Sequence, residues 1–101
     1  MNIVDFIKKK LSIKKLNFEE GFLLIELAKA QKFTIVFLDD SMTFIICDSI
    51  DFCNQNQILH FNCNDCCILR RKVSDIQDIR TVDCSQDEYR KECVRLEELF
   101  V

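Results

Sequence analysis

The stretch HFNCNDCC, residues 60–67, holds the densest group of side chains in this sequence that could do chemistry. One His and three Cys fall within eight residues, with H-x2-C-x2-C spacing. Thiolates and imidazoles are zinc ligands, and a Cys beside a His is also the arrangement of thiol catalysis. The stretch is therefore a metal site, a redox centre, or a β-hairpin that carries sulfur.

An extended backbone separates these groups. Side chains alternate along a strand, so His60 and Cys63 point to opposite faces. A two-residue loop at residues 64–65 pairs Cys63 with Cys66 on one face. Cys67 then falls on the side of His60 and meets it only diagonally. The eight residues cannot all serve one metal ion unless a bulge intervenes.

Structural thiols are the favoured interpretation, because free Cys packs like a small hydrophobe. We therefore expect no metal ion, no cofactor and no catalytic residue, and we predict that the protein is not an enzyme. A zinc-stabilised interaction module remains an alternative, built on Cys63 and Cys66. The residues that could complete its ligand set are Cys47, Cys53 and Cys84.

The composition excludes several enzyme classes. The chain has 101 residues, no Pro and a single glycine, Gly21, whereas phosphate-binding loops, dinucleotide turns and nucleophile elbows all need glycine. With 49% apolar residues and nine Phe, the sequence is typical of a folded domain. The apolar residues of the N-terminus precede its charges, unlike a signal peptide, and no apolar run spans a bilayer. We expect a cytoplasmic protein with reduced cysteines and no membrane partner.

Charge is distributed unevenly. The first 16 residues carry five Lys and one Asp, or +4, so the rest of the chain must carry −7 to give the total of −3. A small nucleic-acid-binding regulator that uses this Lys-rich arm and residues 70–72 is one alternative function. Nucleic acid is an improbable main partner, because the chain is acidic overall and its aromatic residues lie in core-like runs.

The first strand signals lie in the middle of the chain. Residues 33–38 and 42–47 are β-branched and aromatic runs on either side of residues 39–41, and they predict a hairpin. Both runs are nearly continuous in apolar character, so we expect central strands covered on both faces. Residues 48–56 are predicted to be a polar connection.

A second hairpin is predicted from residues 57–63 and 66–73, with His60 opposite Leu69. Residues 79–84 predict a short edge strand, which together with apolar surface could support a homodimer.

Helices are expected at the two ends of the chain. Residues 2–11 predict a helix with Asn2 as its cap. Residues 85–100 predict another, because Ser85 and Glu88 form a capping box. The apolar stripe of this helix consists of Tyr89, Cys93, Leu96 and Phe100.

Residues 18–31 are ambiguous. Asn17 provides cap chemistry, and the run that follows is rich in helix formers, which favours a helix. The alternative is a hairpin with Gly21 in its loop. We expect one α+β domain spanning residues 1–101. Its antiparallel sheet has four to five strands, with the C-terminal helix packed on one face and N-terminal helical segments on the other face or at the end.

The predicted function is a non-catalytic protein-binding module. A compact, acidic chain without cofactor motifs suits a stoichiometric inhibitor or regulator of a nucleic-acid-handling partner. Viral proteins directed against bacterial defence, such as an anti-CRISPR protein, are of this type. Acidic side chains would pair with the basic surface of the partner protein, and the bound module would block access to that surface by steric occlusion. The predicted partner-binding residues are Asp39, Asp40, Asp87, Glu88 and Glu92.

Overall fold

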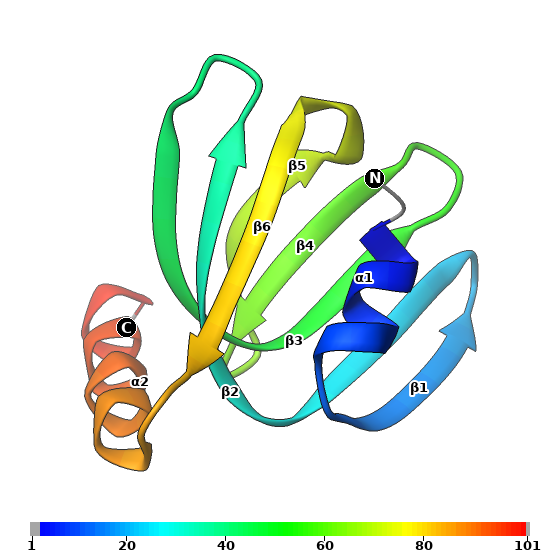
Figure 1. The fold of residues 1–101 in the computed structure, drawn as a ribbon. Helices are drawn as coiled ribbons and strands as arrows, with labels where there is room; N and C mark the ends of the chain where they lie inside the picture. Colours follow the sequence, from blue (N-terminus) through cyan, green and yellow to red (C-terminus); the bar gives the residue numbers. More distant parts are fainter. Residues whose placement is uncertain (1–2, 101) are drawn as a thin grey trace.

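The computed structural model describes the backbone of residues 3–100 and the side chains of residues 5–99 (Figure 1). It confirms the α+β class, with an antiparallel sheet of six strands. In chain order the elements are α1 (Ile3–Lys10), β1 (Ile13–Glu19), β2 (Phe22–Phe37), β3 (Met42–Cys53), β4 (Ile58–Cys63), β5 (Cys66–Lys72), the short 3-10 helix η1 (Val73–Asp75), β6 (Ile76–Asp83) and α2 (Gln86–Phe100).

The long strand β2 organises the sheet. Its N-terminal half pairs with β1 and its C-terminal half pairs with β6, while β3 pairs along its other edge. The sheet continues from β3 through β4 to β5. Between Glu26 and Gln31 the ladder with β3 is interrupted, because four residues of β2 face only Asp48. Such an irregularity bends the strands, and both curve at this point in Figure 1.

The predicted helix over residues 18–31 is wrong. This segment belongs to β1 and β2, which are joined by a turn in which Glu20 and Gly21 have φ angles of 51° and 85°. Helix propensities differ by less than about 1 kcal/mol per residue, so burial overrides them. Alternate residues of β2 enter the core, a period of two that a strand provides. These residues are Leu23, Ile25 and Leu27.

The predicted polar connection over residues 48–56 is also wrong for its first part, because β3 continues to Cys53. Ile50 and Phe52 lie in the core, and Asp51 between them points to the other side. With β1 and this extension of β3, the sheet is larger than predicted and has six strands instead of four to five. The two predicted hairpins are both confirmed, and the predicted edge strand is part of β6.

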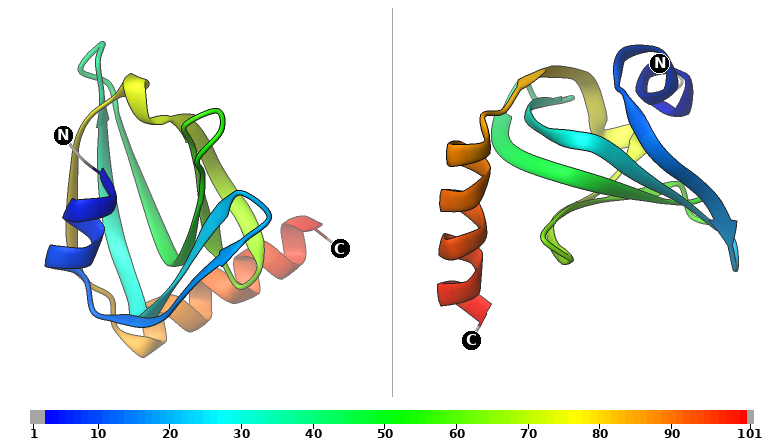
Figure 2. Two further views of the ribbon diagram at one scale, coloured as in Figure 1. Left: turned by 90° about the vertical axis from the view of Figure 1, so that its right-hand side faces the viewer. Right: turned by 90° about the horizontal axis from the view of Figure 1, so that it is seen from below.

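The sheet curls on itself. In a flat sheet β5 and β6 would lie four strand spacings apart, roughly 19 Å. The four peptide steps through η1 span at most about 14 Å, so the two edges must approach each other (Figure 2). Backbone hydrogen bonds fix this closure: Val73 N–H donates to Gln57 C=O at 2.9 Å, and Leu38 N–H donates to Asp75 C=O at 3.1 Å.

The core fills the inside of the curl. Phe33 of β2 and Phe61 of β4 meet edge to face, with ring centroids 5.8 Å apart. Ile7 of α1 and Leu11 just after it join the same cluster, so α1 covers the core. The other members include Ile35, Cys47, Leu59, Ile76 and Ile79.

Both terminal helices are confirmed within the described residues. The predicted cap of α1, Asn2, lies outside those residues. The capping box of α2 is present: Glu88 N–H donates to Ser85 Oγ at 3.1 Å, and Ser85 N–H donates to Glu88 Oε1 at 3.3 Å. The stripe of α2 is buried at Leu96 and half-buried at Tyr89 and Cys93, whereas the side chain of Phe100 lies outside the described part. No helix in the described part is long and apolar enough to cross a membrane.

Candidate functional site

The structure divides the five predicted partner-binding residues into two groups. Asp39 and Asp40 lie in the turn between β2 and β3, and Asp87, Glu88 and Glu92 lie on α2. The turn and the helix are at opposite ends of the β2–β3 hairpin (Figure 1). The three acids of α2 are therefore brought together, but the five residues do not form one cluster.

Each of the three acids on α2 already forms an ion pair. The pairs are Asp87 with Lys91 at 3.2 Å, Glu88 with Lys32 at 2.9 Å, and Glu92 with Arg95. The hydrogen bond from Lys32 lowers the pKa of Glu88. Ion pairs at the surface contribute little net free energy. Lys or Arg side chains of a partner can therefore replace the cations of this chain in these pairs.

The two acids of the turn are exposed. Asp39 accepts hydrogen bonds from the hydroxyl and the amide of Ser41, at 2.5 Å and 3.0 Å, and these bonds lower its pKa. Asp40 has a φ of 68°, the left-handed conformation that Asp tolerates better than most residues. Asp39 therefore stays ionised at neutral pH and displays its charge at the tip of the hairpin.

An uncovered apolar surface lies between the two acidic groups. It consists of one side of the β2–β3–β6 sheet, and we call it the outer hairpin face. Its exposed members are Met42, Phe44 and Val82, which are 56%, 72% and 60% exposed, and its half-buried members are Val36 and Ile46. The strands are central as predicted, but the expectation that both of their faces are covered is wrong.

A groove of about 480 Å³ runs between the outer hairpin face and α2. Phe44, Ile46 and Val82 provide its apolar wall. Glu92 and Arg95 of α2 provide a charged wall. Apolar side chains beside charged ones are the usual composition of a protein interface.

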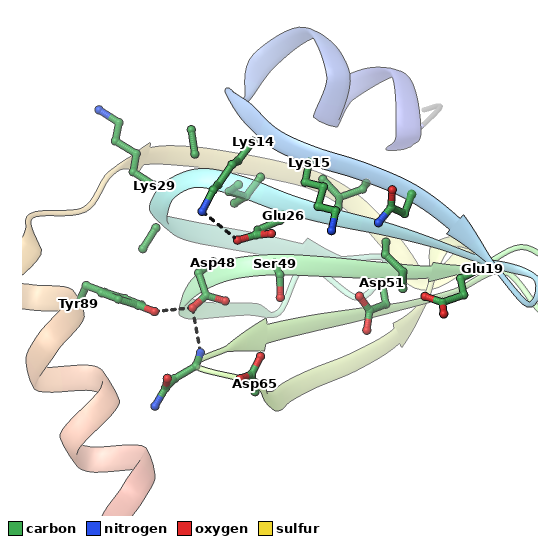
Figure 3. Close-up of a pocket in the computed structure, with 17 residues that line it drawn as sticks. Lys14, Lys15, Glu19, Glu26, Lys29, Asp48, Ser49, Asp51, Asp65 and Tyr89 are labelled. Atoms are coloured by element: carbon green, nitrogen blue, oxygen red, sulfur yellow. Dashed lines mark hydrogen bonds and ion pairs between the residues drawn. The ribbon is translucent and has the colours of Figure 1, made fainter.

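A second groove, of about 680 Å³, lies where β2 and β3 bend (Figure 3). Its lining is polar, with carboxylates from three strands and the β4–β5 turn, and with amines from β1 and β2. Lys14 and Glu26 form an ion pair across it at 3.5 Å. The labelled carboxylates in Figure 3 are Glu19, Glu26, Asp48, Asp51 and Asp65.

Asp48 links three segments of the chain at the end of the second groove that lies next to α2. Its Oδ2 accepts hydrogen bonds from the hydroxyl of Tyr89 at 2.5 Å and from the backbone N–H of Asn64 at 2.9 Å (Figure 3). Burial and the bond to Asp48 raise the pKa of Tyr89. Asp48 thus connects β3, the β4–β5 turn and α2. Sequence reasoning missed this role, because the contact joins residues 41 positions apart.

The lysines of the N-terminal arm are divided between two elements. Lys8, Lys9 and Lys10 are exposed on α1. Lys14 and Lys15 are on β1 and line the second groove beside its carboxylates. Binding of nucleic acid by this arm stays a prediction.

The cysteine-rich hairpin has the predicted turn, with Cys63 opposite Cys66. The predicted pairing of His60 with Leu69 is wrong: His60 lies opposite Arg70, because β5 carries an extra residue in this ladder. Among the residues that the structure describes, no three His, Cys, Asp or Glu side chains are grouped so that they could hold a metal ion.

Most of the seven thiols are shielded. Cys47, Cys53 and Cys63 are buried, and burial raises the pKa of Cys47 and raises that of Cys63 to about 12. Cys66, Cys84 and Cys93 are half-buried, and Cys67 is exposed. Burial thus holds Cys47 and Cys63 as neutral thiols.

Comparison of the chain with protein-family models, with curated proteins and with solved structures finds no match. The function is therefore argued from the surfaces and groups described above.

Proposed function

We propose that the protein is a non-catalytic protein-binding module that occupies a basic surface of a partner protein. The observation that carries this proposal is the outer hairpin face, where exposed Met42, Phe44 and Val82 lie between acidic groups at both ends of the hairpin. The partner would be a nucleic-acid-handling protein, and the inhibition would be steric and electrostatic, as for an anti-CRISPR protein.

Apolar contact supplies the affinity in this proposal. Full burial of a Phe, Met or Val side chain contributes about 1.5–3 kcal/mol each. Phe44, Met42 and Val82 each keep more than half of their surface in solvent, so most of this free energy is available to a partner. Exposed apolar side chains grouped on one face of a sheet, here with Lys32 and Arg80 among them, are found at interaction sites.

Acidic side chains supply the specificity. From Met42 to Ile46 the outer hairpin face extends about 14 Å along the strand. Asp39 and Asp40 lie beyond one end of it, and the acids of α2 lie at the other. This arrangement is complementary to a partner surface that has an apolar group between two basic clusters. Once paired with these acids, the Lys or Arg side chains of the partner could not bind phosphates.

The test uses two variants of the intact chain with matched controls. Phe44→Ser combined with Val82→Ser removes the apolar anchor, and Phe18→Ser is the control, because Phe18 is 77% exposed on β1, away from the outer hairpin face. Asp39→Lys combined with Asp40→Lys reverses the charge at the tip. Partner capture from host lysate is quantified by mass spectrometry at two salt concentrations, and melting temperatures confirm that each variant folds.

We expect one protein to be captured by the wild type and by Phe18→Ser, and to be lost with the Phe44/Val82 variant. The Asp39/Asp40 variant should weaken capture and reduce its salt dependence. Equal capture by all variants would refute the proposed surface. Light scattering tests the alternative that the outer hairpin face holds two copies of this chain together. In that case the wild type is a dimer and only the Phe44/Val82 variant is a monomer. This result would refute the proposal of a different partner protein.

A further inference from the structure

Three neighbouring strands place a carboxylate, an imidazole and a thiol in sequence across the sheet. Asp51 of β3 lies directly opposite His60 of β4, and side chains at such positions have Cβ atoms about 4.5–5.5 Å apart. His60 Nδ1 lies 3.9 Å from the Sγ of Cys67 on β5. The ring of Phe22 meets the imidazole edge to face, at 6.2 Å between centroids, and so limits its orientation. The diagonal contact expected from the sequence is thus a real one.

The thiol of Cys67 lies within reach of the imidazole, and it also lies 3.7 Å from the C=O of Leu69. In the tautomer with hydrogen on Nε2, Nδ1 is an acceptor toward Cys67. Two residues of opposite charge lie opposite His60 in the strand register: Asp51 on one neighbouring strand and Arg70 on the other. Arg70 is on the same strand as Cys67, and Asp51 is on the strand at the other side of His60.

Solvent exposure also distinguishes the thiol of Cys67 from the other thiols. Cys67 is the exposed member of the seven cysteines, all of which lie in the described part of the chain. Reactivity of a cysteine requires a thiolate and access of the reagent to it. The buried thiols lack that access, and the half-buried Cys66, although next in sequence, points to the opposite side from His60.

We propose that Cys67 is a modification site: with His60 as its base, it exchanges with low-molecular-weight disulfides such as oxidised glutathione and forms a mixed disulfide. The proton of Cys67 passes from Sγ to Nδ1 of His60, and the thiolate attacks one sulfur of the disulfide. A bond forms between Sγ and that sulfur while the disulfide bond of the reagent breaks. The released thiolate then takes the proton from the imidazolium. Cys67 is oxidised and the released half of the reagent is reduced, so no other oxidant is needed.

The experiment exposes the folded full-length protein to oxidised glutathione at neutral pH and follows each cysteine by peptide mass spectrometry. Cys67 should be modified at least about tenfold faster than any of the other six. His60→Gln removes the base but keeps a polar side chain of similar reach, and it should slow the modification of Cys67 by about tenfold or more. Asp51→Asn should slow it by a smaller factor. Cys66→Ser is the matched control and should leave the rate at Cys67 unchanged.

Two results would overturn the proposal. One is faster modification of another cysteine in the wild-type protein, which needs no variant to be observed. The other is an unchanged rate at Cys67 in His60→Gln, with His60→Asn as the second variant if the Gln variant does not fold. Neither result bears on the outer hairpin face, which belongs to different residues.

Discussion

At the scale of single residues, Asp48 is the most connected side chain of the second groove. It accepts hydrogen bonds from Tyr89 on α2 and from Asn64 in the β4–β5 turn. A hydrogen bond to a charged acceptor contributes about 1.5–3 kcal/mol, more than one between neutral groups. Asp48 therefore helps to position α2 beside the sheet, together with the buried Leu96 of that helix.

Replacing Tyr89 by Phe tests this role. The substitution keeps the ring and deletes the hydroxyl, so we expect a loss of about 1.5–3 kcal/mol in the free energy of unfolding, measured by urea titration. Asp48→Ala should cost more, because it also leaves the N–H of Asn64 without its acceptor. In the double variant the two losses should not add. Additive losses would show that the two groups do not interact in solution.

The buried thiols predict how stability depends on alkaline pH. Burial raises the pKa of Cys63 from an ordinary value of 9.0 to about 12, because the fold favours the neutral thiol. The unfolded chain releases this proton first as the pH rises. The stabilising effect is therefore complete below pH 9 and is lost as the pH rises from 9 to 12. Cys47 and Tyr89 have pKa values shifted in the same direction.

We accordingly expect the free energy of unfolding to fall with pH above 9, as measured by urea titration at a series of pH values. Cys63→Ala should make that decline shallower, whatever it does to stability at neutral pH. Cys67→Ser is the control and should leave the slope as it is, because Cys67 is exposed. A slope that is the same in all three proteins would contradict the assignment to Cys63.

At the scale of elements, the turn between β1 and β2 depends on Gly21. Its φ of 85° lies in the left-handed region, where a side chain costs about 1–2 kcal/mol. A Cβ at this position would meet no atom within 4 Å, so the cost is conformational and not steric. Gly21→Ala should therefore lower the free energy of unfolding by about 1 kcal/mol, and Gly21→Asn by less, because Asn tolerates this conformation. Equal stability of all three proteins in urea titrations would contradict this account.

Local patterns made part of this fold predictable from the sequence. They indicated the hairpin at Asn64-Asp65, the capping box of Ser85 and the class of the fold. The segment from residue 18 to residue 31 carried two signals, a run of helix formers after Asn17 and a possible hairpin loop at Gly21. Only packing against the rest of the sheet decides between them, because propensities are weak beside burial.

The candidate sites were less predictable, because they depend on contacts between distant segments. The acids on α2 and in the β2–β3 turn were predicted as partner-binding residues, and that stays a prediction; their separation along the hairpin was not predicted. The exposure of Phe44 was missed, since an apolar run of this kind usually indicates a strand buried on both faces. The sequence placed Cys67 on the side of His60 and diagonal to it, because alternation along paired strands is a local rule, but only the structure shows their contact.

At the scale of the whole molecule, the fold and the proposed partner binding depend on surface charge to different degrees. The core is apolar and lies inside the curled sheet, whereas the six ion pairs found in the described part of the chain lie at the surface. Exposed pairs each contribute about 0–1 kcal/mol, and salt screens them. The net charge of −3 is small for a chain of this size, so repulsion within the folded state is also weak.

This difference predicts that salt weakens the proposed binding but hardly changes the stability of the fold. Raising NaCl from 0.05 M to 0.5 M should change the free energy of unfolding by less than about 1 kcal/mol, as measured by urea titration. Over the same range, the affinity for the basic partner should fall, because the acids at both ends of the outer hairpin face are exposed to screening. The charge-reversed Asp39/Asp40 variant provides the control: its stability should respond to salt as the wild type does, and its binding should respond less. A large salt effect on stability with none on binding would mean that the acids serve the fold and not the partner.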